Sequence, residues 1–341
     1  MIPKVSITSH SCNSFSTIKD YKTTTNHDMK YAPQKNITSF KGSINFPINL
    51  SRKHIDYGTI FHDGANIVGK SLQKANANGL KIRNANIKEC NLEKSSFAYA
   101  LLEGTNLTQS NFKFANLMHS NLKNIITKHT DFTCTNLTGS YISGDRLNDE
   151  TNMQKANLCD ADLRDADIRS INFYNAFYND YTRFPVGFDP KKEHMRLIER
   201  GADFSNLVES LKRTQLRYSV FENVNFECSN LRRADIAESY FKNCNLHYTN
   251  LLRAHAKGTI FENCDFTGSD LKQINLKDAE LINCDLRNCN LRGAVLKLHH
   301  MNSSIFEGAL YDQFTEIEGF NPLDYGMVKI ISPLEYYGIR S

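Results

Sequence analysis

Residues 85–107, ANIKECNLEKSSFAYALLEGTNL, carry a large apolar side chain at every fifth position. The same spacing runs from Ile67 to Leu147, and fifteen of these seventeen positions are Leu, Ile or Phe. One extra residue follows, after which the register resumes at Met153 and continues to Tyr178. A period of five fits neither the 3.6-residue period of a helix nor the two-residue alternation of a strand. It predicts a chain that turns inward once every five residues.

A second block with the same period runs from Leu211 to Phe306, and only Ala256 and Met301 in its series are not Leu, Ile or Phe. In both blocks a small residue usually stands two places before the large one, often with Asn or Asp between them. Asn and Asp suit tight corners, because their side chains bond nearby backbone amides and tolerate unusual dihedral angles. Large and small inward residues together can fill a narrow core.

Segments such as Ala-Asn-Leu and Ala-Asp-Leu at this spacing resemble the pentapeptide-repeat family, over roughly residues 55–180 and 211–310. The resemblance implies an all-β fold, a right-handed quadrilateral β-solenoid with four pentapeptides in each coil. Stacked at the spacing of parallel strands, the repeats would make about eleven coils. A loop or short helix near 179–210 interrupts the pattern, and the apolar residues Met195, Leu197 and Ile198 place the expected helix at Lys191 to Arg200.

A four-sided coil of twenty residues predicts columns of like residues at that spacing, and we expect the cysteines to be packed core residues in such columns. There is no C-x-x-C pair that would indicate a metal site. The columns comprise Phe221, Phe241 and Phe261; Asn223, Asn243, Asn263 and Asn283; and Cys244, Cys264 and Cys284.

The breaks in the repeat divide the chain into five expected segments. They are a partly disordered or capping segment at 1–54, a first solenoid block at 55–180, an interrupting loop and short helix at 181–210, a second block at 211–310, and a C-terminal cap at 311–341. Residues 311–322 echo residues 178–190, so each block is expected to end in the same kind of terminating loop. Capping is the favoured role, because an open solenoid end exposes core and strand edges. A contact loop is the alternative.

Bulk properties set limits on the class of protein. The net charge is +4, and no apolar run is long enough to cross a membrane as a helix. Without an apolar leader core, a reducing cytoplasm is the expected location. The Ser- and Asn-rich residues 1–50 resemble leaders of secreted bacterial effectors. The apolar tail from Tyr325 to Tyr337 could cap the last coil or form a homodimer through a solenoid end.

No motif for catalysis, cofactor binding or metal binding is evident. The aspartates at 160, 162, 165 and 167 occupy corner or outward positions, where Asp is a turn former. His299 and His300 are adjacent, without a third ligand at a recognisable spacing. We therefore expect no enzyme, no cofactor and no metal. An enzyme would require a site assembled by the segments outside the repeats.

One outward surface carries an unusual charge pattern. The two residues that follow Leu211, Leu231, Leu251, Leu271 and Leu291 are largely basic, and coil stacking would place like charges opposite each other, which is destabilising. We call these seven residues the basic strip: Lys212, Arg213, Arg232, Arg233, Arg253, Lys272 and Arg292. The strip predicts a site for an acidic protein, a nucleic-acid backbone or an anionic lipid surface. A solvated face screened by salt is the alternative.

These observations favour a non-catalytic binding or scaffold protein that uses its outward faces for protein–protein interaction. A secreted bacterial effector acting on host proteins is one alternative. The family resemblance adds another, because quinolone-resistance members are DNA mimics that engage type II topoisomerases. Mimicry requires an acidic surface, so the net charge of +4 disfavours it.

Overall fold

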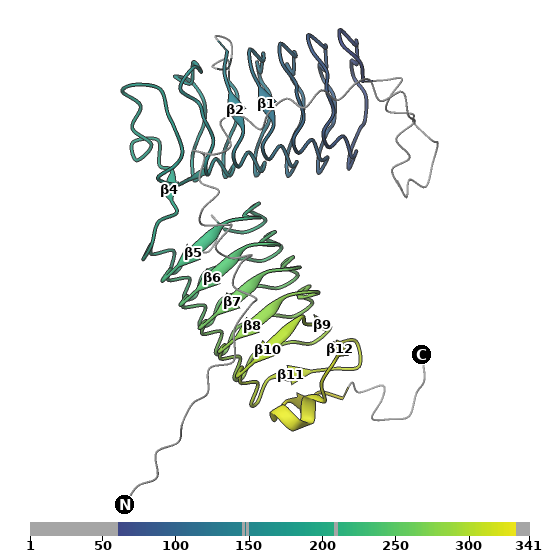
Figure 1. The fold of residues 1–341 in the computed structure, drawn as a ribbon, viewed down its shortest axis with the longest axis vertical. Helices are drawn as coiled ribbons and strands as arrows, with labels where there is room; N and C mark the ends of the chain where they lie inside the picture. Colours follow the sequence, from purple (N-terminus) through teal and green to yellow (C-terminus); the bar gives the residue numbers. More distant parts are fainter. Residues whose placement is uncertain (1–60, 145–146, 148–149, 208–210, 332–341) are drawn as a thin grey trace, which may run out of the picture. The chain divides into compact units, whose positions relative to one another are not determined.

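The computed structural model describes residues 61–144, 147, 150–207 and 211–331. Here the backbone winds into two successive series of coils (Figure 1). Residues one coil apart form parallel bridges, as Asn86 does with Asn106 and Asn225 with Asn245. The fold is the expected all-β solenoid, with about ten turns.

The regular strands are short, because each side of a coil holds only a few residues before the next corner. One side of the second series is a five-stranded parallel sheet of order β10-β8-β7-β6-β5. Its strands are β5 (Val220–Glu222), β6 (Tyr240–Lys242), β7 (Ile260–Glu262), β8 (Glu280–Ile282) and β10 (His300–Asn302). The parallel pairs are β1 (Asn121–Leu122) with β2 (Tyr141–Ile142), β3 (Phe177–Tyr178) with β4 (Arg196–Leu197), β9 (Val295–Lys297) with β12 (Glu316–Glu318), and β11 (Leu310–Tyr311) with β13 (Val328–Lys329). The 3-10 helix η2 spans Pro322–Tyr325.

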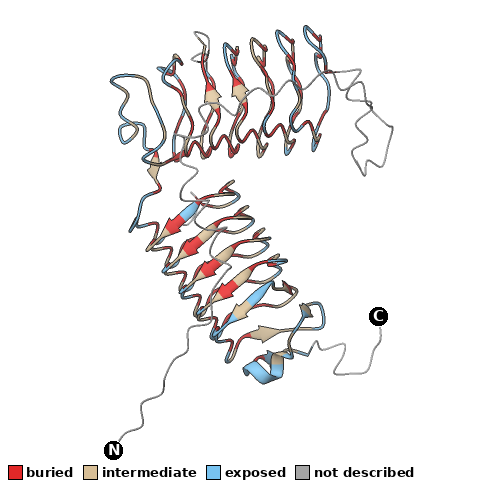
Figure 2. Cartoon of the chain, viewed as in Figure 1, coloured by how far each residue is buried: buried red, intermediate tan, exposed pale blue. Residues whose placement is uncertain are grey.

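The core lies inside the coils, where buried residues recur in turn after turn (Figure 2). Large members of the five-residue series, such as Phe112 and Leu231, are fully buried. The small inward residues often bind the backbone: the Ser110 hydroxyl donates to the Ile87 carbonyl at 2.6 Å. These bonds matter because a buried hydroxyl without a partner costs about 1–3 kcal/mol.

Most corners are tight turns with a left-handed residue in the third position. Ala100 N–H donates to the Phe97 carbonyl at 3.1 Å across such a turn, and Tyr99 between them has φ 59°. The Asn or Asp of the repeat lies just before the corner, and its side chain holds the turn, as Asn91 Oδ1 does for the Glu93 amide at 3.2 Å. The expected side-chain bonding is therefore present. The unusual dihedral angle, however, mostly belongs to the residue three places later.

The predicted columns of like residues form inside and along the second series. The Phe241 ring stacks on Phe221 at 4.6 Å and on Phe261 at 4.9 Å between centroids. The asparagines make a ladder in which Asn243 Nδ2 donates to Asn223 Oδ1 at 3.0 Å, and the two pairs above it repeat the bond. The cysteines at 244, 264 and 284 are buried and free.

The extra residue before Met153 lengthens one coil. Asp131 bridges to Asn152, and Asn136 to Asn157, so these partners are twenty-one residues apart. Within this coil Thr127, an exception to the apolar series, is fully buried, and its hydroxyl lies 2.7 Å from that of Thr151. The paired hydroxyls explain how a polar residue can occupy an inward position.

The loop after the first block covers the end of its core with aromatic rings. Phe188 packs against Phe173 at 5.6 Å and against Phe184 at 4.8 Å, and Phe184 reaches Tyr178 at 5.8 Å. Phe184 and Phe188 thus pack against the core of the first block, and the capping role of the loop stays a prediction.

The expected short helix at 191–200 is wrong. Residues 191–194 form turns, and β4 (Arg196–Leu197) then pairs in parallel with β3 (Phe177–Tyr178). The helix was inferred from apolar spacing alone. The open backbone edge of β3 offers hydrogen bonds to an extended chain, and this pairing prevails over a short isolated helix.

Residues 311–329 repeat the arrangement of residues 178–197. Phe320 packs on Phe306 at 6.0 Å, as Phe188 packs on Phe173, and β13 pairs with β11 as β4 pairs with β3. Met327 N–H donates to the Pro322 carbonyl at 3.1 Å, matching the 3.0 Å bond from Met195 to Pro190. The two loops are thus copies of one structural motif. The segment expected at 1–54 and the tail beyond residue 331 lie outside the described residues.

Candidate partner-binding face

The basic strip follows one column of buried leucines. Leu211, Leu231, Leu251, Leu271 and Leu291 are at most 1% exposed. After each leucine the chain turns, and the amide three residues later donates back to it, as Ala234 N–H does to the Leu231 carbonyl at 2.9 Å. The two residues between them form the corner. Since the leucine points inward, these corner residues must project away from the core.

The structure places the members of the strip at two levels of exposure. Arg213, Arg233 and Arg253 occupy the left-handed position, with φ of 60°, 57° and 58°, and all three are exposed. The preceding position is half-buried, and it is held by Lys212, Arg232, Lys272 and Arg292, with Leu252 in the third coil. In the last two coils the exposed corner position is held by Gln273 and Gly293, which carry no charge. All seven basic residues therefore lie on the same side of the stack.

Two arginines of the strip form side-chain hydrogen bonds with neutral amide groups. Arg253 Nε donates to Gln273 Oε1 at 2.6 Å, and Arg292 Nε donates to Asn290 Oδ1 at 2.9 Å. Asp270, the one nearby acidic residue of this column, accepts instead from the Asn290 amide group at 3.0 Å. Among the residues that the structure describes, no carboxylate lies within 4.0 Å of the strip's five arginines or of Lys272.

The same position of the repeat is neutralised elsewhere in the chain. Arg164, Arg169 and Arg287 each form an ion pair with the aspartate two residues earlier, at 2.6–2.7 Å. The hydrogen bonds from Arg169 and Arg287 hold the pKa of Asp167 and of Asp285 below its usual value. In the strip, Arg232 and Arg292 follow asparagines at this position. Arg232 and Arg292 therefore lack an aspartate partner that this position of the repeat can supply.

The adjoining side of the second block provides a contrast, because its basic residues are mixed with acidic ones. Arg217 lies 3.5 Å from Asp235, Lys257 lies 3.7 Å from Asp278, and Lys297 lies 3.2 Å from Glu316. Concentrated positive charge with little compensation thus distinguishes the strip. Its two corner columns also contain no aromatic residue.

The aspartates and cysteines considered in the sequence analysis have structural roles, and the histidine pair is an exception. Asp162 and Asp167 pair with arginines, and Asp165 accepts from the Tyr141 hydroxyl at 2.8 Å. Burial raises the pKa of Cys289 to about 12, so its thiol is protonated and unreactive at neutral pH. The exception is the pair of histidines near the end of the second block.

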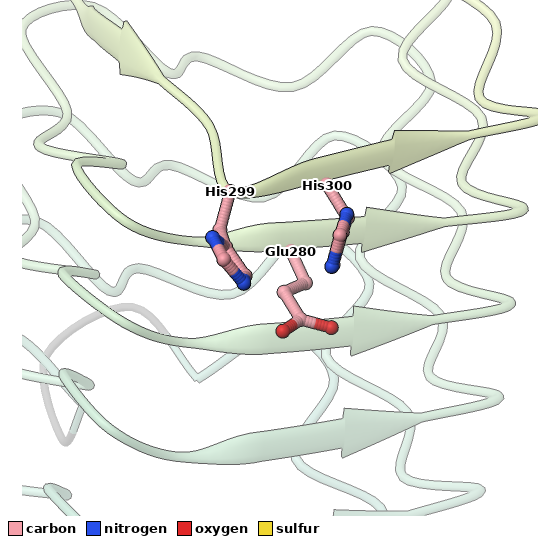
Figure 3. A group of neighbouring side chains, drawn as sticks. All are labelled: Glu280, His299 and His300. Atoms are coloured by element: carbon pink, nitrogen blue, oxygen red, sulfur yellow. The ribbon is translucent and has the colours of Figure 1, made fainter. Parts of the chain in front are cut away.

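Sequence reasoning found no third ligand for His299 and His300, but the structure supplies one. Glu280, one coil earlier, brings its carboxylate beside both imidazole rings (Figure 3). The signal available in the sequence was the twenty-residue period, which makes Glu280 the stacking neighbour of His300. These three are the residues that could hold a metal ion.

The coils, corners and side-chain columns define a β-solenoid repeat protein. Comparison with protein families agrees: the pentapeptide repeat region matches residues 214–291, and pentapeptide repeats (8 copies) match residues 85–124 and 149–177. The chain is a pentapeptide-repeat protein. No curated protein matches its sequence.

Several solved structures share the repeat architecture at low similarity. HetL, a pentapeptide repeat protein involved in heterocyst differentiation regulation from the cyanobacterium Nostoc sp. strain PCC 7120, is 21% identical, with 73% of this chain and 89% of HetL covered and a TM-score of 0.23. QnrB1, a plasmid-mediated fluoroquinolone resistance protein, is 14% identical over 82% of this chain and 95% of its own, with a TM-score of 0.17. Rfr23, a pentapeptide repeat protein from the cyanobacterium Cyanothece 51142, is 19% identical, with 36% of this chain and 89% of Rfr23 covered and a TM-score of 0.19. At these values the comparisons say nothing about function.

Membrane-spanning helices were also considered. No helix in the described part of the chain is long and apolar enough to cross a bilayer.

Proposed function

We propose that this chain is a non-catalytic binding protein whose basic strip holds an acidic surface of a protein partner. The observation that carries the proposal is the alignment of seven basic side chains on one side of the second block, six of which have no carboxylate partner among the described residues. Stacked like charges lower the stability of the fold. A partner that neutralises them would recover that energy on binding.

The corner geometry supports this role. Each strip position is fixed by a turn whose leucine is buried, so the backbone from which the charged side chains extend is arranged before the partner arrives. Such preorganisation reduces the ordering cost of association. Positive potential along the strip would also steer an acidic partner toward this side.

A protein partner is favoured over single-stranded nucleic acid. Binding of single strands usually combines a basic groove with aromatic side chains on which bases stack. The two corner columns of the strip contain no aromatic residue. A duplex backbone, which needs charge alone, is distinguished experimentally.

We expect the protein to act in a reducing compartment such as the cytoplasm. The eight cysteines of the described residues are all free, and seven of them are buried. A fold that uses thiols as small core residues does not depend on disulfides.

The test compares capture of proteins and nucleic acids from a lysate by the wild type and by the triple variant R213E/R233E/R253E. A control, K70E/K74E/K81E, makes the same change of charge at three exposed lysines of the first block. We expect the triple variant to lose a protein that the wild type and the control both retain. Circular dichroism verifies that all three proteins are folded.

Two outcomes would contradict the proposal. If the triple variant captures the same proteins as the wild type, the strip is not the binding face. If the charge-dependent material is removed by nuclease treatment, the partner is a nucleic acid backbone.

A further inference from the structure

The last two regular coils of the second block together carry a cluster of three metal-ligating side chains. Glu280 lies on β8, His300 on the neighbouring β10, and His299 directly before it. One ligand atom from each residue lies within 4.8 Å of the other two. Figure 3 shows the Glu280 carboxylate between the two imidazole rings. The cluster therefore joins two successive coils.

His299 lies beside His300 because the pattern of small inward residues is broken at position 299. The equivalent residues of the four preceding coils are small and buried: Ser219, Ser239, Thr259 and Ala279. An imidazole is too large for this inward column, and His299 is instead exposed.

The backbone hydrogen bonds also change at His299. In the preceding coil the Ala279 amide closes the corner by donating to Leu276, and the Glu280 amide donates to the Thr259 carbonyl at 3.0 Å. One coil later the His299 amide itself donates to the Ala279 carbonyl at 2.8 Å, one residue earlier than the pattern requires. This shift turns His299 outward, beside His300.

The two histidines are close without being stacked face to face. Their ring centroids are 4.3 Å apart, and the ring planes make an angle of 52°. Both rings are exposed, and Glu280 is half-buried. Exposed side chains can rotate toward a common centre at little cost in packing. The edges of both rings remain accessible to solvent.

We propose that Glu280, His299 and His300 form a binding site for a divalent transition metal ion, with Zn²⁺ as the representative ion. Imidazole nitrogen and carboxylate oxygen are ligands that zinc commonly takes, at about 2.0–2.2 Å. A tetrahedral ion would need ligand atoms about 3.3 Å apart, so the present spacing requires only small side-chain rotations. Three protein ligands leave a fourth position open to water or to a side chain of a partner.

Binding at this site would hold the end of the solenoid together. The two histidines belong to the last regular coil, and Glu280 belongs to the one before it. An ion that binds the folded state alone raises the stability of that state in proportion to the logarithm of its concentration. The site thus adds a metal-dependent clamp next to the C-terminal cap.

The test measures Zn²⁺ binding by competition with a chromophoric chelator. All proteins are full-length and carry Cys12→Ser and Cys228→Ser, because Cys228 is an exposed thiol and Cys12 a further cysteine that could bind zinc. We expect one equivalent to bind. Removing a ligand should weaken binding by at least about tenfold, both in H299A/H300A and in E280Q.

A matched control is H129A/H194A, which removes two other exposed histidines. It should bind Zn²⁺ as the parent protein does. Thermal unfolding without metal shows whether each variant is folded, and added Zn²⁺ should raise the midpoint only where the three ligands are intact. The proposal is overturned if the parent binds no Zn²⁺, or if H299A/H300A binds it with the affinity of the parent.

Discussion

Thr182 and Thr315 occupy the same place in the two terminating loops, which are copies of one structural motif. The Thr182 hydroxyl accepts from the Asn179 amide at 3.0 Å, and the Thr315 hydroxyl accepts from the Asp312 amide at 3.0 Å. Each hydroxyl also lies within hydrogen-bond distance of a core carbonyl twenty-four residues earlier, that of Leu158 or of Leu291. The hydroxyl therefore ties each terminating loop to the last coil beneath it.

Replacing Thr315 by Val should loosen the C-terminal cap, with a cost of about 1 kcal/mol for the lost hydrogen bonds. The amides of Gly293 and Asp312, which both donate to this hydroxyl at 3.0 Å, should exchange hydrogen faster. Thr182→Val serves as the control, because it should accelerate exchange at Asn179 and leave the other two amides unchanged. Unaltered exchange at Gly293 and Asp312 would show that the hydroxyl does not secure the cap.

The asparagine ladder predicts an order of stability for substitutions at Asn263. Its side chain bonds the asparagines above and below, and its backbone is left-handed with φ 53°. Ala loses the ladder and is strained at this dihedral angle by roughly 1–2 kcal/mol, whereas Gly loses the ladder without this strain. Urea unfolding should therefore rank the wild type above Asn263→Gly, and Asn263→Gly above Asn263→Ala. An Ala variant as stable as the Gly variant would contradict this account.

Repulsion within the basic strip should be visible as a salt effect. Arg233 lies between Arg213 and Arg253 along the stack, so Arg233→Gln should stabilise the protein at low salt by about 0.5 kcal/mol. The gain should shrink at high salt, because the charges are then screened. The control is Arg287→Gln, which breaks the 2.6 Å pair with Asp285 and should destabilise at low salt. The measurement is the thermal unfolding midpoint of the wild type and of both variants at low and at high salt. An Arg233→Gln variant that is not stabilised at low salt would contradict the prediction.

The Asp285–Arg287 pair also predicts an acid-dependent loss of stability. Hydrogen bonding to Arg287 lowers the pKa of Asp285 in the folded state. A lowered pKa means that the pair stabilises the fold above the unfolded value of about 3.9, and that this contribution is lost as the pH falls below it. The difference in stability between the wild type and Arg287→Gln should therefore narrow in acid. A difference that stays constant down to low pH would be evidence against the pair.

The solenoid could be predicted from the sequence because the five-residue period is dense within each block and its segments resemble pentapeptide repeats. The five-residue series from Leu211 to Phe306 indicates which side chains are buried. The four-sided coil that the family resemblance implies then aligns the phenylalanine, asparagine and cysteine columns. The outward direction of Arg213, Arg233 and Arg253 follows from the same logic, since each stands two residues after a buried leucine. Their role as a binding site remains a prediction.

Tertiary structure decided the features that depend on neighbouring coils. Residues 191–200 have helix-like spacing, but the free edge of β3 takes the extended segment Arg196–Leu197 as β4. Similarly, the small inward column has no space for the His299 ring, so the corner shifts and His299 joins His300 above Glu280. A five-residue pattern specifies which side chains must be buried. It cannot specify what happens where a side chain is too large for its column, because that outcome depends on the packing and hydrogen bonds of the adjacent coil.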